Sequence, residues 1–404
     1  MSETKETLGA LAGLRVLDIG SFIAAPFAAT LMAEHGAEVF KVELPNVGDH
    51  ARRLGTASEA GDSFIWLSEA RNKKSICIDL RKPDGAEIFK SLVAVSDVVC
   101  ENFQTGTLEG WGLGWDVLSA VNPKLILLRI SGYGQSGPYS ARPCFGRIAN
   151  AFGGISFLSG EPDRPPAQPG SATLSDYMAG LFGAYAVQLA LRVRERDGCG
   201  QVIDLALYDG IFRILDEVAP AYQKTGFIRR RDGAETPLVV PHSHYPTADG
   251  RWIAIACTND RIFARLAGAM GHPEFMDDSR YATNLSRIAN RSEVNRMVSD
   301  WTSAMGRDEV LQRCSEAEVP CGPVYGIDEI FDDPHYAARG NILHVNDERV
   351  GDLAIPNVVP TLSVTPGRVQ TLGPRLGSHT DEILETVLNM DPQIIASLRQ
   401  KGVI

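Results

Sequence analysis

Short apolar runs alternate with longer segments of helical spacing over the first 150 residues of the chain. The run LRVLDIG is rich in branched residues, a helical segment AAPFAATLMAEHG follows it, and AEVFKVE is a second apolar run. A strand, a helix and another strand in close succession are typical of a βαβ unit with parallel strands. Further strands are predicted at KKSICIDL, SDVVCENF and KLILLRISGYG, with helical stretches between them. This alternation predicts a doubly wound, Rossmann-like α/β sheet.

The polarity of the chain changes after residue 222. A polar and basic segment, KTGFIRRRDGAE, separates the first part from a block that reads as a hairpin followed by helices. The hairpin turn is an Asp-Gly pair, a dipeptide favoured in two-residue turns. We therefore predict a large domain that begins with residues 1–222, a smaller α+β domain at 223–335, and a C-terminal segment at 336–404 that returns to the large domain.

Composition and charge narrow the classes of function. The chain has 404 residues, of which 44% are hydrophobic and 22% charged, as in ordinary globular proteins. The net charge of −11 argues against a nucleic-acid partner, and the basic run at Arg229–Arg231 is expected to be a solvated loop. The N-terminus lacks the pattern of a signal peptide, and no apolar run is long enough for a membrane span. We predict a cytoplasmic protein without a membrane partner.

No metal site or tightly bound cofactor is predicted. The seven cysteines are an odd count without a CxxC pair, which argues against a disulfide framework and against zinc. His242 and His244 would point to one face of a strand, but no third ligand accompanies them. The segment Gly132–Gly137 (GYGQSG) matches GxGxxG formally. Pro138 follows at once and no acidic residue stands about twenty positions later, so we do not interpret it as a dinucleotide site.

Asp176 is the candidate catalytic residue. It follows a proline-rich loop, 162–170, and precedes an apolar helical run that extends through Ala190 and is expected to be buried on most sides. A serine or threonine cap would leave Asp176 in the first helical turn, where negative charge is favoured. A carboxylate at a buried, glycine-rich helix start is a candidate nucleophile that forms acyl anhydrides. An ordinary helix cap or first-turn acid is the alternative.

Six segments in register resemble the class III coenzyme A transferases. They are LRVLDIGSFIAAPFAATLMAEHGAEVFKVE, RNKKSICIDL, ENFQTGTLEGWGLGWDVL, RISGYGQSGPY, TLSDYMAGLFGAYA and LGPRLGSHTDEIL. The resemblance covers essentially the whole chain. It implies that CoA thioesters are substrates, and that two ring-like subunits, each with a large CoA-binding domain and a small domain, form an interlocked homodimer.

The resemblance also implies a mechanism. Asp176 attacks the donor thioester and forms a mixed anhydride with release of CoA thiolate, which then attacks the anhydride and leaves an aspartyl-CoA thioester. The acceptor carboxylate reverses these steps. The oxyanions formed on the way need backbone N–H donors in a dry pocket. We assign this role to the loop of Gly132, Gly134, Gln135 and Gly137, for which a plain strand-to-loop turn is the alternative.

Five residues are expected to bind CoA. The resemblance implies that Asn102 and Phe103 match an Asn-Phe pair that contacts CoA, and that Lys41 lies near the adenine end. Arg71 and Lys73 fall in the segment that lines CoA, where they are plausible phosphate partners or, alternatively, part of a solvated strand start. The chain departs from the family's commoner ENFRPG pattern, because it reads ENFQTG.

Two other functions are alternatives. The α-methylacyl-CoA racemases resemble this fold and use a histidine just after the GPY loop, but Phe145 stands there and cannot transfer a proton. A catalytically silent CoA-binding subunit of a hetero-oligomer is the second alternative, and the presence of Asp176 argues against it.

Arg147 is the candidate determinant of the acceptor acid. Transferases of the family commonly have a small residue at this position, and an arginine could bind a second carboxylate bidentately. A salt bridge within the dimer is the alternative. The whole chain most resembles the family members that use succinyl-CoA with malate or citramalate. We therefore expect CoA transfer from succinyl-CoA to a C4 or C5 dicarboxylate such as malate, citramalate or itaconate.

Overall fold

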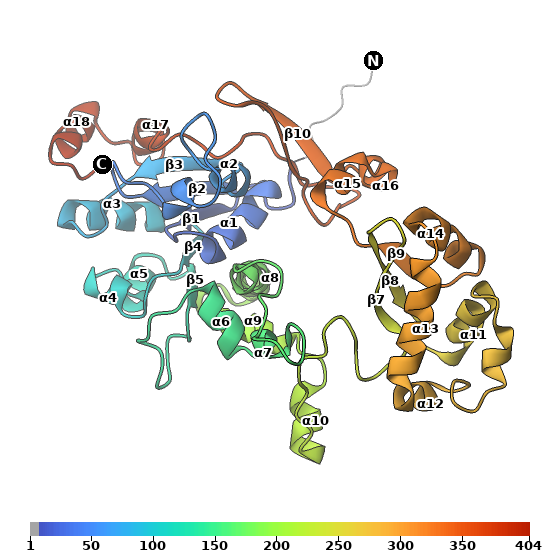
Figure 1. The fold of residues 1–404 in the computed structure, drawn as a ribbon. Coiled ribbons are helices and arrows are strands. Elements are labelled where there is room, and N and C mark those ends of the chain that lie inside the picture. The colour runs from blue at the N-terminus through green and yellow to red at the C-terminus, as the bar shows by residue number, and fades with distance from the viewer. Residues whose placement is uncertain (1–7) are drawn as a thin grey trace. The chain divides into compact units, whose positions relative to one another are not determined.

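A computed structural model describes residues 8–404, which form two compact units (Figure 1). The first unit extends to Ile155 and also includes Pro169–Gly226 and Ala338–Ile404. The second comprises Ser156–Gln168 and Phe227–Ala337. The segment Ser156–Gln168, which the sequence analysis left in the large domain, belongs to the second unit. Its contacts there include a hydrogen bond of 3.1 Å from the Gly233 N–H to the Gly160 carbonyl.

A six-stranded sheet forms the centre of the first unit, in the order β3-β2-β1-β4-β5-β6, and every neighbouring pair is parallel. The strands are β1 (Arg15–Asp18), β2 (Glu38–Glu43), β3 (Lys73–Cys77), β4 (Val98–Glu101), β5 (Ile126–Ser131) and β6 (Gln201–Ala206). This order is typical of doubly wound dinucleotide-binding folds, in which the chain changes direction between β1 and β4. The predicted parallel α/β sheet is confirmed.

Helices cover both faces of this sheet (Figure 1). Successive residues of β1 enter different cores, because strand side chains alternate between faces. Val16 packs with α1 and α8, whereas Leu17 packs with α3, α5 and the C-terminal helices. The helices of the first unit are α1 (Ala24–Glu34), α2 (Phe64–Glu69), α3 (Pro83–Ala94), α4 (Thr107–Gly110), α5 (Trp115–Val121), α6 (Gly146–Phe152), α8 (Leu174–Asp197), α9 (Leu207–Arg213), α10 (Val218–Thr225), α17 (Thr380–Thr386) and α18 (Pro392–Gln400), with a 3-10 turn η1 (His50–Arg53).

The C-terminal part of the first unit holds a hairpin and two helices. Strands β10 (Ile342–Asp347) and β11 (Gly351–Pro356) pair antiparallel, and α17 contributes buried side chains to the core beneath β3. The last helix of the chain, α18, was not predicted from the sequence. The local signal was present, because the Asp391 carboxylate accepts from the Gln393 N–H at 2.7 Å and Pro392 occupies the first helical position.

The second unit is built on a three-stranded antiparallel sheet in the order β7-β8-β9. Strands β7 (His242–Pro246) and β8 (Trp252–Ala256) form the predicted hairpin, and β9 (Cys321–Pro323) joins its edge. Its helices are α11 (Asp260–Ala269), α12 (Asn284–Ala289), α13 (Arg291–Ser303), α14 (Arg307–Glu316) and α15 (Ile327–Asp332), with a 3-10 turn η2 (Pro273–Met276). Along the chain, α7 (Ile155–Leu158) and α16 (Pro334–Arg339) each span a point where one unit ends and the other begins.

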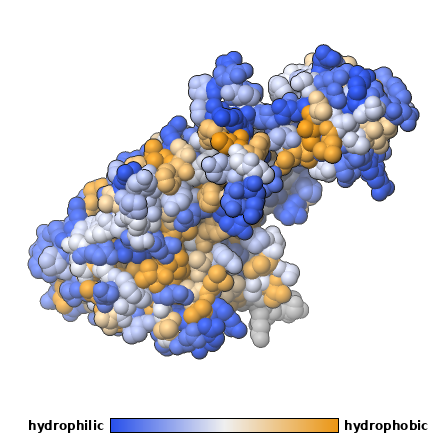
Figure 2. Space-filling model, turned by 90° about the horizontal axis from the view of Figure 1, so that it is seen from below, coloured by the Kyte–Doolittle hydropathy of each residue, from blue (hydrophilic) through white to orange (hydrophobic). Residues whose placement is uncertain are grey.

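Helix α8 is buried or half-buried on most sides through Ala190, as expected, but one of its faces is exposed. Leu181, Tyr185 and Leu189 follow each other at intervals of four residues and are 52%, 60% and 51% exposed. Residues four apart lie on the same helix face, so these side chains form one apolar stripe. Figure 2 shows apolar residues in several patches among hydrophilic ones on the face that it draws. Among residues 8–404, no helix combines the length and apolar character that a membrane crossing requires.

Candidate active site

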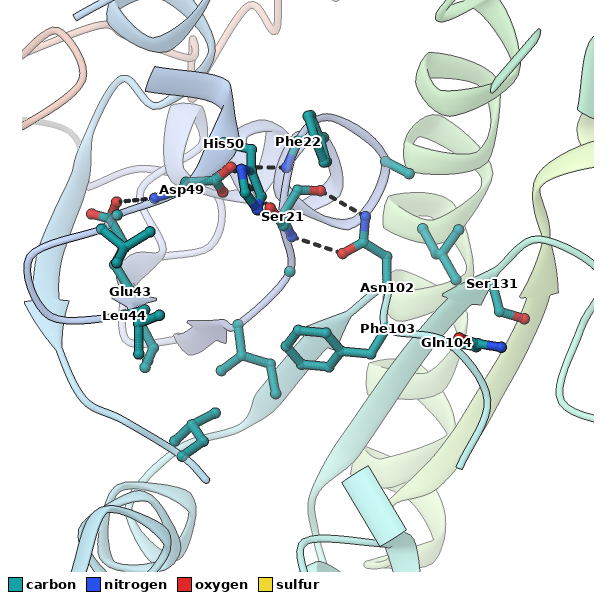
Figure 3. A pocket seen from close by; sticks show the side chains of 18 of the residues that line it. Ser21, Phe22, Glu43, Leu44, Asp49, His50, Asn102, Phe103, Gln104 and Ser131 are labelled. Atoms are coloured by element: carbon teal, nitrogen blue, oxygen red, sulfur yellow. Dashed lines mark hydrogen bonds between the residues drawn. The ribbon is translucent and has the colours of Figure 1, made fainter. Parts of the chain in front are cut away.

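A cavity of about 480 Å³ lies within the first unit, beyond the carboxyl ends of its strands (Figure 3). The segments that follow β1, β2, β3, β4 and β5 all contribute to its walls, as expected for the ligand crevice of a doubly wound sheet. The start of α8 contributes Asp176, and the loop before α6 contributes Cys144 and Phe145. The predicted ligand-binding edge and the candidate nucleophile therefore meet in one cavity.

Asp176 lies in the first turn of α8, which follows Thr173 as the N-cap. Burial raises the pKa of its carboxyl from the ordinary value to about 6, while its own backbone N–H acts in the opposite direction. Within residues 8–404, no lysine, arginine or histidine forms an ion pair with this carboxylate. A half-buried carboxylate without a cation is costly for folding, which is typical of a group kept for chemistry.

Gly146, the first residue of α6, lies directly against this carboxylate. A Cβ atom at this position would come within 2.1 Å of Asp176 Oδ2 and 2.7 Å of the Ala172 carbonyl. The Ser175 hydroxyl donates to the Gly146 carbonyl at 3.0 Å and holds the two segments together. The sequence analysis missed Gly146, because nothing in the sequence shows that a glycine thirty residues before the aspartate packs on it.

The N-terminus of α1 is a second feature of the cavity. Its first amides have no side-chain cap and no acidic residue in the first turn, and Ala24 is buried on the cavity wall. This end of α1 packs on the first turns of α8, since the Phe27 and Tyr177 rings are 4.8 Å apart. A Cβ at Gly180 would approach the Ala24 carbonyl to 2.7 Å. Uncapped amides at a helix N-terminus favour an anion, so this end of α1 can bind negative charge that develops near Asp176.

Two of the residues predicted to bind CoA, Asn102 and Phe103, line the cavity. Lys41, Arg71 and Lys73 do not, because each is buried in an internal ion pair. Lys41 Nζ lies 2.7 Å from Asp49 Oδ2, Lys73 Nζ lies 2.9 Å from Asp18 Oδ2, and Arg71 Nε lies 3.0 Å from Glu34 Oε1. Their placement fits a structural role inside the sheet, and their assignment to CoA binding stays a prediction.

The predicted oxyanion loop contributes one residue, Gly132, to the cavity wall. Gly134, Gln135 and Gly137 lie outside the wall. The Gln135 N–H is already donated to the Asp204 carboxylate, at 3.0 Å from one oxygen and 3.1 Å from the other. Gly132 and the first amides of α1 are therefore the candidate donors to an oxyanion on the cavity wall.

Arg147 is the second residue of α6 and is exposed to solvent. It lies outside the cavity wall, and within the described part of the chain it forms no ion pair. Phe145, two residues before it, lines the cavity and contacts the Phe22 ring edge-on, with 6.0 Å between the ring centroids. The aromatic residue that replaces the racemase histidine is therefore part of the site.

Arg81 and His50 are basic residues of the cavity wall that the sequence analysis missed. Arg81 is more than half exposed and lies 2.7 Å from Asp79, at the end of the segment that follows β3. A signal was available, because ligands in a parallel sheet meet residues after a strand rather than before it. The predicted phosphate partners, Arg71 and Lys73, lie before and at the start of β3 instead.

Comparison with known proteins identifies the relatives of this chain. The family model described as CoA-transferase family III matches residues 11–380. The beta subunit of succinyl-CoA–L-malate CoA-transferase from Chloroflexus aurantiacus is 52% identical over 100% of both chains. Succinyl-CoA–D-citramalate CoA-transferase from Chloroflexus aurantiacus is 45% identical over 97% of each. The crystal structure of a CAIB/BAIF family protein from Brucella suis superposes with a TM-score of 0.82 and 34% identity, over 93% of this chain and 99% of the other.

Proposed function

Because the chain belongs to CoA-transferase family III, we propose that it moves CoA from succinyl-CoA to a C4 or C5 dicarboxylic acid, with malate, citramalate and itaconate as candidate acceptors. The observation that carries the proposal is the unpaired carboxylate of Asp176 on the wall of a large cavity. Relatives that share half or nearly half of their residues with this chain are named for malate and citramalate.

In the proposed reaction, a carboxylate oxygen of Asp176 attacks the thioester carbon of the donor. A C–O bond forms, the C–S bond breaks, CoA leaves as a thiolate, and a mixed anhydride of Asp176 and succinate remains. The thiolate then attacks the aspartyl carbonyl of the anhydride and releases succinate, which leaves an aspartyl-CoA thioester. The acceptor carboxylate repeats these two steps in reverse, so that Asp176 is regenerated and neither ATP nor water is consumed.

Each attack creates an oxyanion beside Asp176. The amides at the start of α1, whose N-terminal end packs against α8, are the donors we assign to it, with Gly132 as a further candidate on the wall. The positive end of the α1 dipole adds to this stabilisation. Because these donors are fixed by a helix and a sheet, they need little rearrangement in the transition state.

We further propose that the active form is an interlocked homodimer. The apolar stripe of Leu181, Tyr185 and Leu189 supports an oligomer, since a monomer rarely exposes such a row on one helix. A relative named as a beta subunit makes a second, homologous chain the competing arrangement. Activity of the purified single chain distinguishes the two.

Assay of the purified chain with succinyl-CoA and a panel of acids tests the function. We expect new CoA esters, detected by mass spectrometry, with malate and citramalate above glutarate and above monocarboxylic acids. In the same panel, Arg147→Ala should raise KM for the dicarboxylate several-fold and far more than KM for succinyl-CoA, because Arg147 is proposed to bind the second carboxylate of the acceptor. Absence of every CoA ester would contradict the proposed function. An unchanged acceptor KM would contradict the role of Arg147 alone.

The rate of exchange should depend on the protonation of Asp176. Only the carboxylate is nucleophilic, and the pKa of this group is raised to about 6. We expect kcat/KM for succinyl-CoA to be constant above this pH and to fall about tenfold per pH unit below it. Exchange of isotopically labelled succinate into succinyl-CoA between pH 5 and 8 measures this. The labelled succinate is kept saturating, because its own second carboxyl titrates in the lower part of this range. A flat profile down to pH 5 would exclude a group with this pKa as the nucleophile.

A further inference from the structure

The turn between β1 and α1, residues Gly20–Phe22, is held by side chains from other strands. Asn102, just after β4, uses both ends of its carboxamide on Ser21: the Ser21 N–H donates to Oδ1 and Nδ2 donates to the Ser21 carbonyl, each at 2.7 Å (Figure 3). Asp49 accepts from the Phe22 N–H at 2.9 Å, and Lys41 donates to the Gly20 carbonyl at 2.5 Å. The turn therefore has little freedom of its own.

The backbone conformation of this turn is strained. Phe22 has φ of 62°, in the left-handed region that residues other than glycine adopt only when their surroundings impose it. Its ring stacks on His50 with 5.1 Å between centroids. The chain enters α1 two residues later, at Ala24, so the conformation of the turn sets the direction of the first helical amides.

A buried network of charged side chains fixes Asp49, which contacts the turn Gly20–Phe22. Lys41 Nζ lies 2.7 Å from Asp49 and 3.4 Å from Asp18, and the three side chains are almost completely buried. Asp49 also accepts from the Ser21 hydroxyl at 3.1 Å. Breaking one member would leave buried charge unpaired, so the network fixes the position of the Asp49 carboxylate.

We propose that Asn102 is a positioning residue that clamps the turn Gly20–Phe22 and thereby holds the first amides of α1 beside Asp176. The inference rests on the proposed function and changes the role that the resemblance implies for Asn102. The Oδ1 atom and one N–H of its carboxamide already have partners in Ser21, which supports a role of Asn102 through the turn. Asp49 is its counterpart on the other side of the turn.

A split between kcat and KM tests this role. In Asn102→Ala, the released turn should let the α1 amides move, which we expect to lower kcat of labelled succinate exchange by about 10- to 100-fold. KM for succinyl-CoA should stay within about twofold of the wild-type value, because no direct contact is lost. A rise in KM with unchanged kcat would assign Asn102 to direct CoA binding and overturn the proposal, as would unchanged kinetics.

Asn122→Ala is the matched control. Asn122 also clamps main chain with both ends of its carboxamide, since Nδ2 donates to the Ser96 carbonyl at 2.7 Å and Oδ1 accepts from the Lys124 N–H at 3.0 Å, but it lies outside the cavity wall. We expect a similar loss of stability and unchanged kcat. An equal loss of kcat in both variants would show general destabilisation and overturn the positioning role.

A crystal structure of Asn102→Ala tests the clamp without any activity. We expect Phe22 to leave the left-handed region and the first turn of α1 to shift. An unchanged turn would overturn the inference even if the enzyme is active. If the wild-type protein exchanges no CoA while the variant shows a displaced turn, the proposed function fails and the clamp stands.

Discussion

Asp176→Asn is expected to reduce CoA exchange by at least about 10³-fold and, at the same time, to make the protein more stable. The loss follows because an amide oxygen cannot displace CoA from the thioester. The gain follows because burial raises the pKa of this carboxyl to about 6, so the charged form is disfavoured in the folded state. At pH 7.5, the neutral asparagine avoids this cost, so the free energy of unfolding should increase by an amount on the order of 1 kcal/mol.

The pH dependence of stability is a second measurement of the predicted effect of Asp176→Asn. A carboxyl whose pKa is higher in the folded than in the unfolded state stabilises the fold when protonated, and this contribution is lost as the pH rises through about 6. The difference in unfolding free energy between variant and wild type should therefore grow from pH 4 to pH 7. Urea titrations at several pH values measure it.

The competing interpretation of Asp176 as an ordinary first-turn acid predicts the opposite sign. Removing a stabilising charge from a helix N-terminus costs about 0.3–1 kcal/mol. Asp116 is such a residue, exposed in the first turn of α5 and outside the cavity wall, so Asp116→Asn is the control. We expect it to lose a little stability and no activity. A less stable Asp176→Asn with normal exchange would remove the carboxylate from the mechanism.

The sheet and its ligand-binding edge could be predicted because their signals are local. Each strand is a short apolar run with its own flanking turn, and parallel order follows from the alternation of strands and helices. The position of Asp176 in the first turn of α8 is local in the same sense, and the structure confirms it.

The rest of the site depends on contacts that are distant in sequence. Lys41 reads as a free cation near the end of an apolar strand, yet the structure pairs it with Asp18 and Asp49 from other segments. Asn102 and Ser21 are 81 residues apart, so nothing in the sequence indicates that one clamps the other. The exposure of the α8 stripe could not be predicted either. An apolar helix face has the same sequence pattern whether its own chain or another chain covers it.

Gly146→Ala is expected to lower kcat about 10²-fold while the fold stays intact. The added methyl carbon would lie 2.1 Å from Asp176 Oδ2, closer than any Cβ contact that proteins tolerate, so the carboxylate must turn away. A displacement of about 1 Å at the reacting atom suffices for such a loss. Alanine favours a helical position over glycine, but its Cβ would also lie 2.7 Å from the Ala172 carbonyl, so we expect a folded variant with some loss of stability. Steady-state exchange of labelled succinate measures the effect, with urea unfolding as the check on the fold.

Gly268→Ala in α11 is the control, because no other atom lies within 4 Å of its added carbon. It should match the wild type in exchange and be no less stable in urea unfolding, because alanine favours a helical position. The double variant Gly146→Ala with Asp176→Asn then identifies the path of the effect. If Gly146 acts only by leaving room for the carboxylate, the double variant should be no slower than Asp176→Asn alone, since residues that act as one unit are not additive. A further multiplicative loss, or normal exchange in Gly146→Ala, would mean that the reacting group does not occupy the position found here.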